Sequence, residues 1–340
     1  MEFLAEYGLF FLKVLTFVIA AVVIIALASS SHSGDSEDGE IRVSSLNDSY
    51  KYVSASLEGA ILPEKALKEK AKEEKKAAKK AAKQKNVTDK NRVYVLEFIG
   101  DVRAKAAEQL RKEVSAVLSV ATAQDEVVIK LESPGGVVHG YGFAASQLKR
   151  IRDKNIPLTI CVDKVAASGG YMMSCIGNKI IAAPFAMVGS IGVVAQIPNF
   201  HRILQKNDID YELHTAGEYK RTLTMFGENT DEGRAKFNEE LELTHDLFKH
   251  FVSEHRPQLD IDAIATGEVW FGSQALENQL VDELGTSDEY LMDAVARADV
   301  YSVSYKEKKT WQSRLGFAAE NSISNIVEKT VSDLWVNRFK

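Results

Sequence analysis

Short apolar runs alternate with helix-like stretches between residues 93 and 182, and this alternation limits the possible folds more than any other feature of the chain. Strand-like runs and helix-like stretches follow one another at 93–98, 104–120, 127–131, 140–154, 158–162, just after Ser168, and 179–182. Strands that alternate with helices pair in parallel, with the helices as crossovers. The sequence therefore predicts an α/β domain, and the roughly 200 residues available suit one domain with a large core.

The chain beyond residue 182 has a less regular pattern. We expect strand-like runs at 191–197 and 211–214, a helix at 200–207 and a long amphipathic helix at 231–254. Apolar residues on one face of the long helix indicate packing against a core or an interface. These residues are Phe237, Leu241, Phe248, Phe251 and Val252. No internal repeat is present, so we expect a single catalytic unit.

Two of the predicted strands run directly into glycine-rich turns. Ser168 lies in Ala-Ser-Gly-Gly after the run at 158–162, where small residues allow a sharp bend and expose the hydroxyl. Backbone N–H groups at the start of the following helix would face a developing oxyanion. Ser133-Pro-Gly-Gly136 follows the run at 127–131, and glycines there permit positive φ and close backbone approach. Each turn alone is compatible with an ordinary loop, but two in succession indicate a nucleophile and its oxyanion donors.

Four motifs in order extend this pattern into a family resemblance. They are Ser133-Pro-Gly-Gly136, Ala167-Ser-Gly-Gly-Tyr171, Val188-Gly-Ser-Ile-Gly-Val193 and Gly217-Glu-Tyr-Lys220, with further matches at 270–272, 274–275 and 281–285. With them, residues 93–298 resemble the signal peptide peptidase A family. The resemblance implies an α/β, ClpP/crotonase-like fold of repeated strand-strand-helix units. It also implies a serine endopeptidase that forms an acyl-enzyme.

The resemblance assigns roles to five residues. It implies Ser168 as the nucleophile, Lys220 as the general base, Ser190 as the group that orients the lysine amine, and the Gly136 and Gly169 N–H groups as the oxyanion hole. A serine hydroxyl needs such a base, and a lysine amine accepts a proton only in its neutral form, which burial favours. We expect an apolar pocket around the lysine from Tyr219, Leu223, Met225 and Phe226.

Other interpretations of the same residues remain open. His139 or His214 could serve as the base, with Asp163 as the orienting group, although ClpP-type proteases place their histidine near the position that Gly189-Ser190 occupies here. A catalytically silent, membrane-tethered scaffold of the same fold is a second alternative, and a crotonase-like acyl-CoA enzyme is a third. The serine and lysine count against the scaffold, and the apolar N-terminus counts against the acyl-CoA enzyme.

Composition excludes several classes of function. The formal net charge of −6 carries no basic signature for nucleic acid. Dinucleotide-binding and Walker-type glycine spacings are absent, and His245, His250 and His255 fall five residues apart, so they do not share a helical face as metal ligands would. Cys161 and Cys175 lie in apolar runs and are expected to be buried. We predict neither a metal nor a cofactor.

The N-terminus predicts a membrane anchor. Residues 9–28 are almost wholly apolar, and about 20 such residues span a bilayer. Lys13 is near one end, where a lysine can snorkel to the headgroups. Ala26-Leu-Ala28 resembles a signal-peptidase site, but the length favours an uncleaved transmembrane anchor at 1–28. The family resemblance implies a single-pass protein of the bacterial inner membrane with a periplasmic catalytic domain.

The remaining segments complete the expected organisation. Residues 29–92 form a polar linker with a helical Lys/Ala/Glu tract, which carries ten lysines between Lys65 and Lys85 and is either a spacer or a membrane-surface contact. The peptidase domain covers 93–298, and 299–340 is an amphipathic C-terminal tail with an apolar stripe between Ile323 and Trp335. The resemblance also implies a homo-oligomeric ring that brings the lysine of one subunit to the serine of its neighbour. Peptides near the membrane, including signal-peptide remnants, are the expected substrates.

Overall fold

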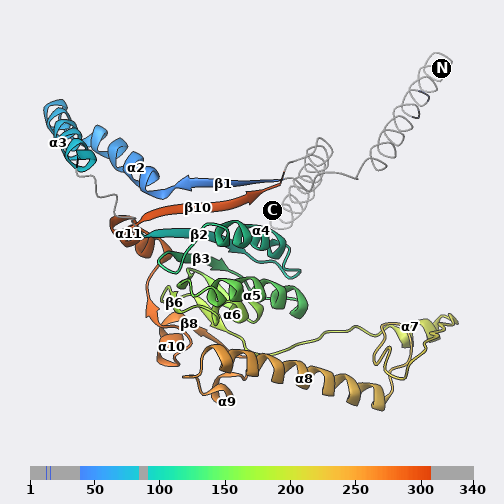
Figure 1. Cartoon of the computed structure of the whole chain (residues 1–340). Helices are drawn as coiled ribbons and strands as arrows, with labels where there is room; N and C mark the ends of the chain where they lie inside the picture. Colours follow the sequence, from blue (N-terminus) through green and yellow to red (C-terminus); the bar gives the residue numbers. More distant parts are fainter. Residues whose placement is uncertain (1–12, 14–15, 17–38, 84–90, 308–340) are drawn as a thin grey trace, which may run out of the picture. The chain divides into compact units, whose positions relative to one another are not determined.

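The computed structural model describes residues 13, 16, 39–83 and 91–307 (Figure 1). The chain divides into two compact units, and the unit formed by residues 41–305 holds nearly all the described residues. The predicted anchor, apart from two residues, and most of the predicted C-terminal tail lie outside the described residues. Among the residues described, no helix combines the length and apolar character needed to cross a membrane.

A seven-stranded sheet forms the centre of the unit, with strand order β1-β10-β2-β3-β4-β6-β9. Its central strands occur where the apolar runs predicted them: β2 (Arg92–Ile99), β3 (Glu126–Glu132), β4 (Leu158–Val162) and β6 (Lys179–Ala182). These four strands pair in parallel, as do β10 (Asp299–Lys306) with β2 and β9 (Glu283–Leu284) with β6. The expected parallel α/β arrangement is therefore confirmed.

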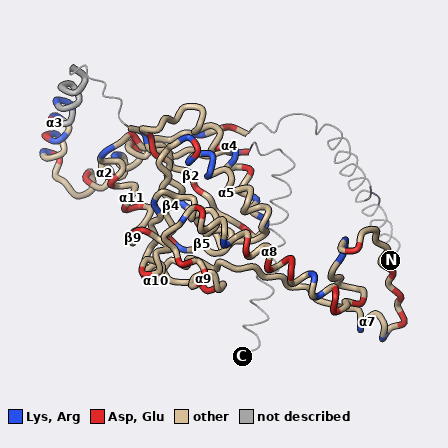
Figure 2. Tube along the Cα trace, turned by 60° about the horizontal axis from the view of Figure 1, so that its bottom comes forward, with Lys and Arg blue, Asp and Glu red and all other residues tan. Residues whose placement is uncertain are grey.

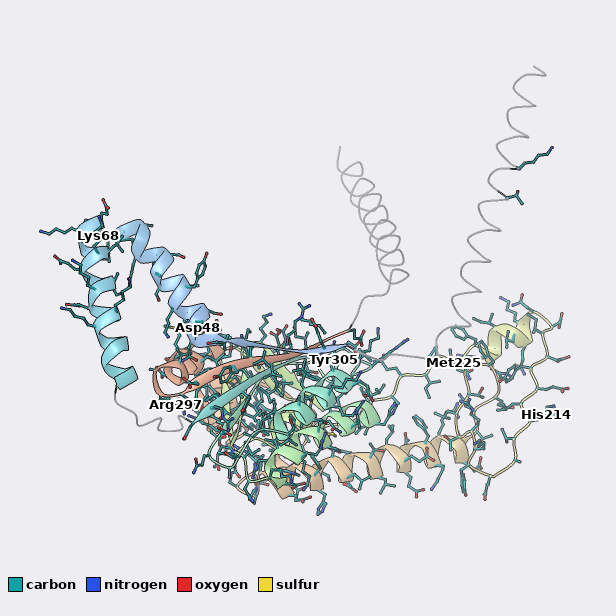
Figure 3. All side chains as sticks on the ribbon, turned by 45° about the horizontal axis from the view of Figure 1, so that its top comes forward. Asp48, Lys68, His214, Met225, Arg297 and Tyr305 are labelled. Carbon is teal, nitrogen blue, oxygen red and sulfur yellow. The ribbon has the colours of Figure 1, made fainter. Side chains whose placement is uncertain are left out.

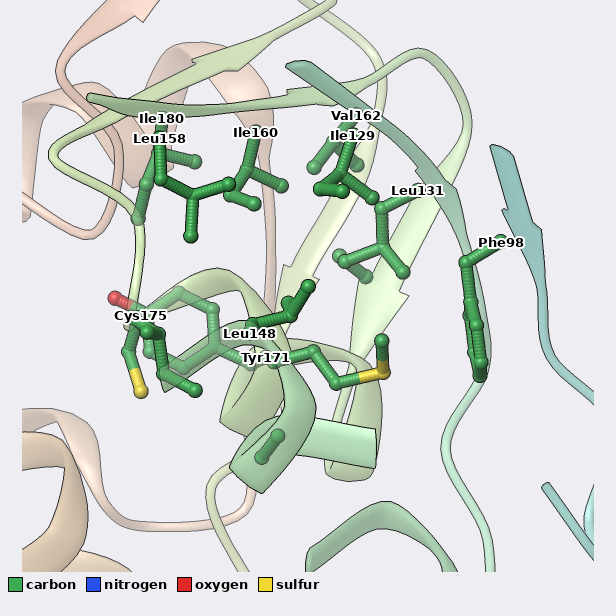
Figure 4. Packing of buried hydrophobic residues seen from close by; sticks show 14 of the residues in the cluster. Phe98, Ile129, Leu131, Leu148, Leu158, Ile160, Val162, Tyr171, Cys175 and Ile180 are labelled. Atoms are coloured by element: carbon green, nitrogen blue, oxygen red, sulfur yellow. The ribbon is translucent and has the colours of Figure 1, made fainter. Parts of the chain in front are cut away.

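The central strands β2, β3, β4 and β6 are buried on both faces, which explains why they are nearly continuous apolar runs. On one face, Ile129 and Ile160 pack in a cluster with Leu148 of α5 (Figure 4). On the other, Val128 and Cys161 cluster with Leu291. The helices α4 (Ala106–Leu118), α5 (Val138–Asp153) and α6 (Gly169–Ser174) are among those that contribute to the first cluster, and α11 (Ser287–Arg297) contributes to the second.

A smaller three-stranded sheet lies beyond the carboxyl ends of β3 and β4. It consists of β5 (Val165–Ala167), β7 (Met187–Gly189) and β8 (Val269–Phe271), with β5 parallel to β7 and β7 antiparallel to β8. A parallel bridge between Ser133 and Ala166 joins the end of β3 to β5. The two glycine-rich turns of the sequence are thereby held side by side.

The segment between β7 and the long helix α8 (Asp231–His255) differs from the prediction. Neither 191–197 nor 211–214 forms a strand, although α7 (His201–Lys206) and α8 form where helices were expected. Apart from Ile191, which is buried in the core, the apolar residues of both runs are largely exposed and meet no partner strand; Val194, for example, is 81% exposed. Residues 193–230 form their hydrogen bonds and ring contacts among themselves or with the first two turns of α8 (Figure 1).

The main sheet also extends past both boundaries predicted for the peptidase domain. β1 (Glu40–Ser45) lies in the predicted linker and β10 lies in the predicted tail. The Asn47 side chain joins these regions, since it accepts from the Val300 N–H and donates to the Ala298 carbonyl. Two helices follow β1, namely α2 (Leu46–Ile61) and α3 (Glu64–Lys83), and α3 occupies the tract predicted to be helical. Basic and acidic residues are interspersed along α3 (Figure 2).

The remaining short helices complete the described chain. They are α9 (Ile261–Ile264) and α10 (Gly272–Glu277), which lie on either side of β8 in the sequence. An ion pair between buried Arg256, at the end of α8, and Asp282, just before β9, ties these segments together at 2.8 Å. The chain thus returns from α8 to the edge of the main sheet beside β6.

Candidate active site

Ser168 is held in an unusual backbone conformation between β5 and α6. Its φ of 52° and ψ of −117° lie in a region that residues with a Cβ rarely adopt. The backbone is fixed on both sides, because its N–H donates to the Gly189 carbonyl at 2.8 Å and its carbonyl accepts from the Met172 N–H at 2.9 Å. The half-buried side chain does not cap α6, and within the described chain its hydroxyl has no hydrogen-bond partner. Strain of this kind is characteristic of functional positions.

The turn after β3 is pressed against this serine. Gly135 has a φ of +86°, and a Cβ added to it would lie 2.8 Å from both the Gly169 nitrogen and the Ser168 Cβ. Gly136 is equally confined on its other side, where an added Cβ would lie 2.1 Å from the Val102 carbonyl oxygen. In the described part of the chain the N–H groups of Gly136 and Gly169 donate to no backbone carbonyl. Both are therefore available to a ligand beside the serine.

Two residues behind this turn were not singled out by the sequence. The Ser133 hydroxyl and the Tyr141 hydroxyl are 2.6 Å apart, and both residues are fully buried. The sequence marked Ser133 only as the first residue of a turn. Tyr141 lies on the buried face of α5, and no role was predicted for it. A polar hydroxyl on a helix face that is otherwise apolar is the signal that could have identified Tyr141, since such a group needs a buried partner.

Ser190 is brought close to Ser168 by strand register. Ala167 of β5 pairs with Gly189 of β7, so the serines that follow these two residues are neighbours. Ser190 is half-buried, has a φ of 53°, and donates its N–H to the Glu268 carbonyl at 2.6 Å. Two neighbouring serines with positive φ, beside two free N–H groups, form the candidate site.

Lys220 does not join this group within one chain. Its side chain is exposed, and its backbone N–H donates to the Gly217 carbonyl at 3.2 Å. No hydrogen bond or ion pair connects it to Ser168 in the described structure. The expected apolar pocket is also not closed within one chain, because Tyr219 is 56% exposed and Met225 is 41% exposed. Met225 is labelled in Figure 3, within the same segment that carries Lys220.

The histidines and the aspartate considered as an alternative catalytic triad are either exposed or hydrogen-bonded to other residues. His139 is exposed near the start of α5, and His214, labelled in Figure 3, is exposed and lies 3.1 Å from Glu212. Asp163 accepts hydrogen bonds from the Ser287 N–H at 2.7 Å and the Ser287 hydroxyl at 2.5 Å. No described hydrogen bond connects either histidine to Asp163 or Ser168, so the structure assembles no histidine triad.

The described residues contain no group of three or more His, Cys, Asp or Glu side chains arranged to hold a metal ion. Both cysteines are buried and free. Burial, followed by the nearby Asp163 carboxylate, raises the pKa of the Cys161 thiol to about 12. The thiols are therefore protonated core groups and supply no second nucleophile to the site.

Comparison with known proteins identifies the family. Residues 2–148 match the model of the peptidase family S49 N-terminal region, and residues 150–301 match the model of peptidase family S49. A Haemophilus influenzae protein named probable protease SohB is 48% identical over 96% of both chains. A protein of the same name from Buchnera aphidicola subsp. Acyrthosiphon pisum is also 48% identical, over 97% of this chain and 98% of its own.

Two more distant similarities concern another protease and a solved structure. Protease 4 of Haemophilus influenzae is 29% identical over 48% of this chain and 27% of its own length. Among solved structures, a mutant of the 1510-N membrane-bound stomatin-specific protease with a substrate peptide aligns with 66% of this chain and 96% of its own, at 14% identity and a TM-score of 0.40. On the two family matches and the 48% identities, the chain belongs to peptidase family S49.

Proposed function

We propose that the chain is a serine endopeptidase in which Ser168 attacks the substrate. The observation that carries this proposal is the backbone of Ser168, which has a φ of 52° at the first turn of α6 and presents an unpartnered hydroxyl. Such strain costs about 1–3 kcal/mol and persists only where the surrounding structure enforces it. The presence of both Ser168 and Lys220 counts against a catalytically silent scaffold.

The proposed reaction pairs a nucleophile, the Ser168 hydroxyl, with a general base, the Lys220 amine. The Ser168 oxygen attacks the substrate carbonyl carbon while its proton moves to the neutral amine of Lys220, which Ser190 orients. The N–H groups of Gly136 and Gly169 stabilise the negative oxygen that forms. The intermediate collapses to an acyl-enzyme as the leaving amine takes the proton from Lys220. Water then attacks the acyl-enzyme, with Lys220 again as the base, and releases Ser168.

The proposal requires Lys220 to come from a neighbouring subunit of a homo-oligomeric ring. Support comes from the segment 193–230, in which Lys220 is exposed and many apolar side chains are exposed as well. The exposed apolar residues are Val194, Ile197, Phe200, Ile203, Ile209, Tyr211, Leu213, Tyr219, Met225 and Phe226. Apolar surface that a chain does not cover itself marks a contact with another molecule. A second copy supplies both the cover for these residues and the pocket that favours a neutral amine.

We also propose a location and a substrate class. The apolar stretch at 9–28 supports a single-pass membrane anchor. The family resemblance supports the bacterial inner membrane as its location, with the catalytic domain in the periplasm. The motifs shared with signal peptide peptidase A support the ClpP/crotonase-like fold and substrates such as signal-peptide remnants and unfolded segments near the bilayer. The mixed charges along the described chain (Figure 2) do not favour nucleic acid as a partner.

Covalent labelling tests the proposal. The full chain is incubated with a fluorophosphonate probe, and the same is done with Ser168→Ala and with the control Ser146→Ala. Ser146 is exposed on α5 and bonds only its own helix, to the Gly142 carbonyl at 2.8 Å. Wild type and Ser146→Ala should be labelled and Ser168→Ala should not. Labelling of folded Ser168→Ala at the wild-type rate would exclude Ser168 as the nucleophile.

A further inference from the structure

The Tyr141 side chain contacts Ser133, at the start of the turn that carries Gly136, and Gly169, at the start of α6. It projects from α5 and is fully buried. Its hydroxyl donates to the Asp101 carbonyl at 2.9 Å and lies 2.6 Å from the Ser133 hydroxyl, which in turn is the acceptor for the Gly135 N–H at 3.1 Å. A chain of hydrogen bonds therefore leads from the glycine turn through the protein interior to the loop after β2.

The direction of the protons in this chain follows from simple chemistry. A carbonyl can only accept, so the single Tyr141 proton goes to Asp101. The Ser133 hydroxyl must then donate to the Tyr141 oxygen, which leaves the serine oxygen to accept from the Gly135 N–H. Each of the two hydroxyls is used once as donor and once as acceptor, and aligned hydrogen bonds of this kind reinforce one another. The glycine turn is thus held from behind by a polarised relay.

The ring of Tyr141 supports the second segment. A Cβ added to Gly169 would lie 2.3 Å from the Tyr141 Cγ, so the first residue of α6 rests directly on the ring. Phe98 packs edge-on against the same ring, with centroids 6.3 Å apart. Gly100 closes the space around the relay, because a Cβ there would lie 2.4 Å from the Tyr141 hydroxyl and 2.5 Å from the Ser133 hydroxyl.

We propose that Tyr141 and Ser133 are positioning residues that set the distance between the Gly136 and Gly169 N–H groups. The hydroxyl relay fixes the turn that carries Gly136, and the tyrosine ring fixes the start of α6 that carries Gly169. One side chain therefore determines the width of the oxyanion hole without touching the substrate. This inference rests on the proposed function, since it assumes that these two N–H groups bind the oxyanion.

Saturation kinetics of fluorophosphonate labelling test the inference on the full chain. Tyr141→Phe keeps the ring and removes the relay, and Ser133→Ala removes its middle member. Preorganised N–H donors act on the transition state, so each variant should lower the maximal labelling rate about 10–100-fold. The probe concentration at half-saturation should stay within about threefold of wild type, because ground-state binding does not use the hole. The double variant should be no more than about threefold slower than the slower single variant, since both changes break one relay.

Tyr305→Phe is the matched control. Tyr305 lies in β10, is 7% exposed, and its hydroxyl accepts from the Lys112 ammonium at 2.9 Å. This variant therefore also loses a buried tyrosine hydroxyl. It should label at the wild-type rate, with unfolding followed in parallel to show that all variants fold. The inference would be overturned if Tyr141→Phe had the wild-type maximal labelling rate, or if only the probe concentration at half-saturation changed. It would also be overturned if the effects of the two single variants on the maximal rate multiplied in the double variant. Labelling of Ser168→Ala would instead overturn the proposed function, so the two failures are distinguishable.

Discussion

Replacing Gly135 with alanine should separate the glycine turn from the nucleophile. Gly135 has a φ of +86°, and the added Cβ would lie 2.7 Å from the Ala167 carbonyl oxygen and 2.8 Å from both the Gly169 nitrogen and the Ser168 Cβ. Real Cβ atoms essentially never approach other heavy atoms closer than 3.0 Å. The close atoms belong to the backbone or to a Cβ, so no flexible side chain can move aside. The turn itself has to shift away from Ser168.

Gly267 provides a control with the same backbone strain and no overlap. Its φ is +84°, and an added Cβ would meet no heavy atom within 4 Å. An alanine with left-handed backbone costs about 1–2 kcal/mol, and the reduced freedom of the unfolded chain offsets about 0.4–1 kcal/mol of this. Gly267→Ala should therefore lower the free energy of unfolding by about 1 kcal/mol or less. Overlap adds about 1–3 kcal/mol at Gly135, for a total of roughly 1–4 kcal/mol.

Urea unfolding and fluorophosphonate labelling of the two variants measure these effects together. A displacement of about 1 Å in a catalytic arrangement lowers a rate by about 100-fold. Gly135→Ala should therefore label about 100-fold more slowly than wild type, while Gly267→Ala stays within about threefold. If the two variants were equally stable and labelled equally fast, the turn would not be pressed against the nucleophile and the description of the site would be wrong.

Two other predictions concern the base and the cysteines. Lys220→Arg should fold but lose peptide hydrolysis, because a guanidinium stays protonated and cannot act as a base. Lys206→Arg, on the same segment, is the control and should keep its activity. Peptide hydrolysis by Lys220→Arg near the wild-type rate would contradict the proposed role of Lys220. Cys161, whose pKa burial raises to about 12, and the buried Cys175 should resist iodoacetamide at about pH 8 and react only after unfolding in urea. Mass spectrometry that finds either thiol alkylated in the folded protein would contradict their burial.

The central sheet could be predicted from the sequence because its strands are buried on both faces. Ile129 and Ile160 face one layer of helices while Val128 and Cys161 face the other, so the whole run is apolar and stands out. The position of Ser168 in a sharp turn could also be predicted from the sequence, since glycines next to a serine indicate a bend. The order of the strands could not be predicted, because the pairing of β10 with β2 joins residues some 200 positions apart and depends on tertiary packing alone.

The segment 193–230 could not be predicted for a different physical reason. Apolar runs at 191–197 and 211–214 indicated strands, yet only Ile191 is buried in the core, and most other apolar side chains there are exposed and have no partner strand in the described structure. Tyr141 was missed because helical periodicity identifies a buried face but not the partner of a hydroxyl on it. That partner, the Asp101 carbonyl, lies 40 residues away in the sequence. Long-range contacts of this kind appear only once the fold is known.

Mixing two inactive variants tests most directly whether the site is shared between subunits. Ser168→Ala and Lys220→Ala should each be inactive alone. In rings assembled at random from equal amounts of both, an intact serine meets an intact lysine of its neighbour at about a quarter of the interfaces. Peptide hydrolysis should then return to about a quarter of the wild-type level and should vary with the mixing ratio as the product of the two fractions. If mixed rings form, as shown by co-purification of two affinity tags, and remain inactive, the lysine does not come from the neighbouring subunit and the account is contradicted.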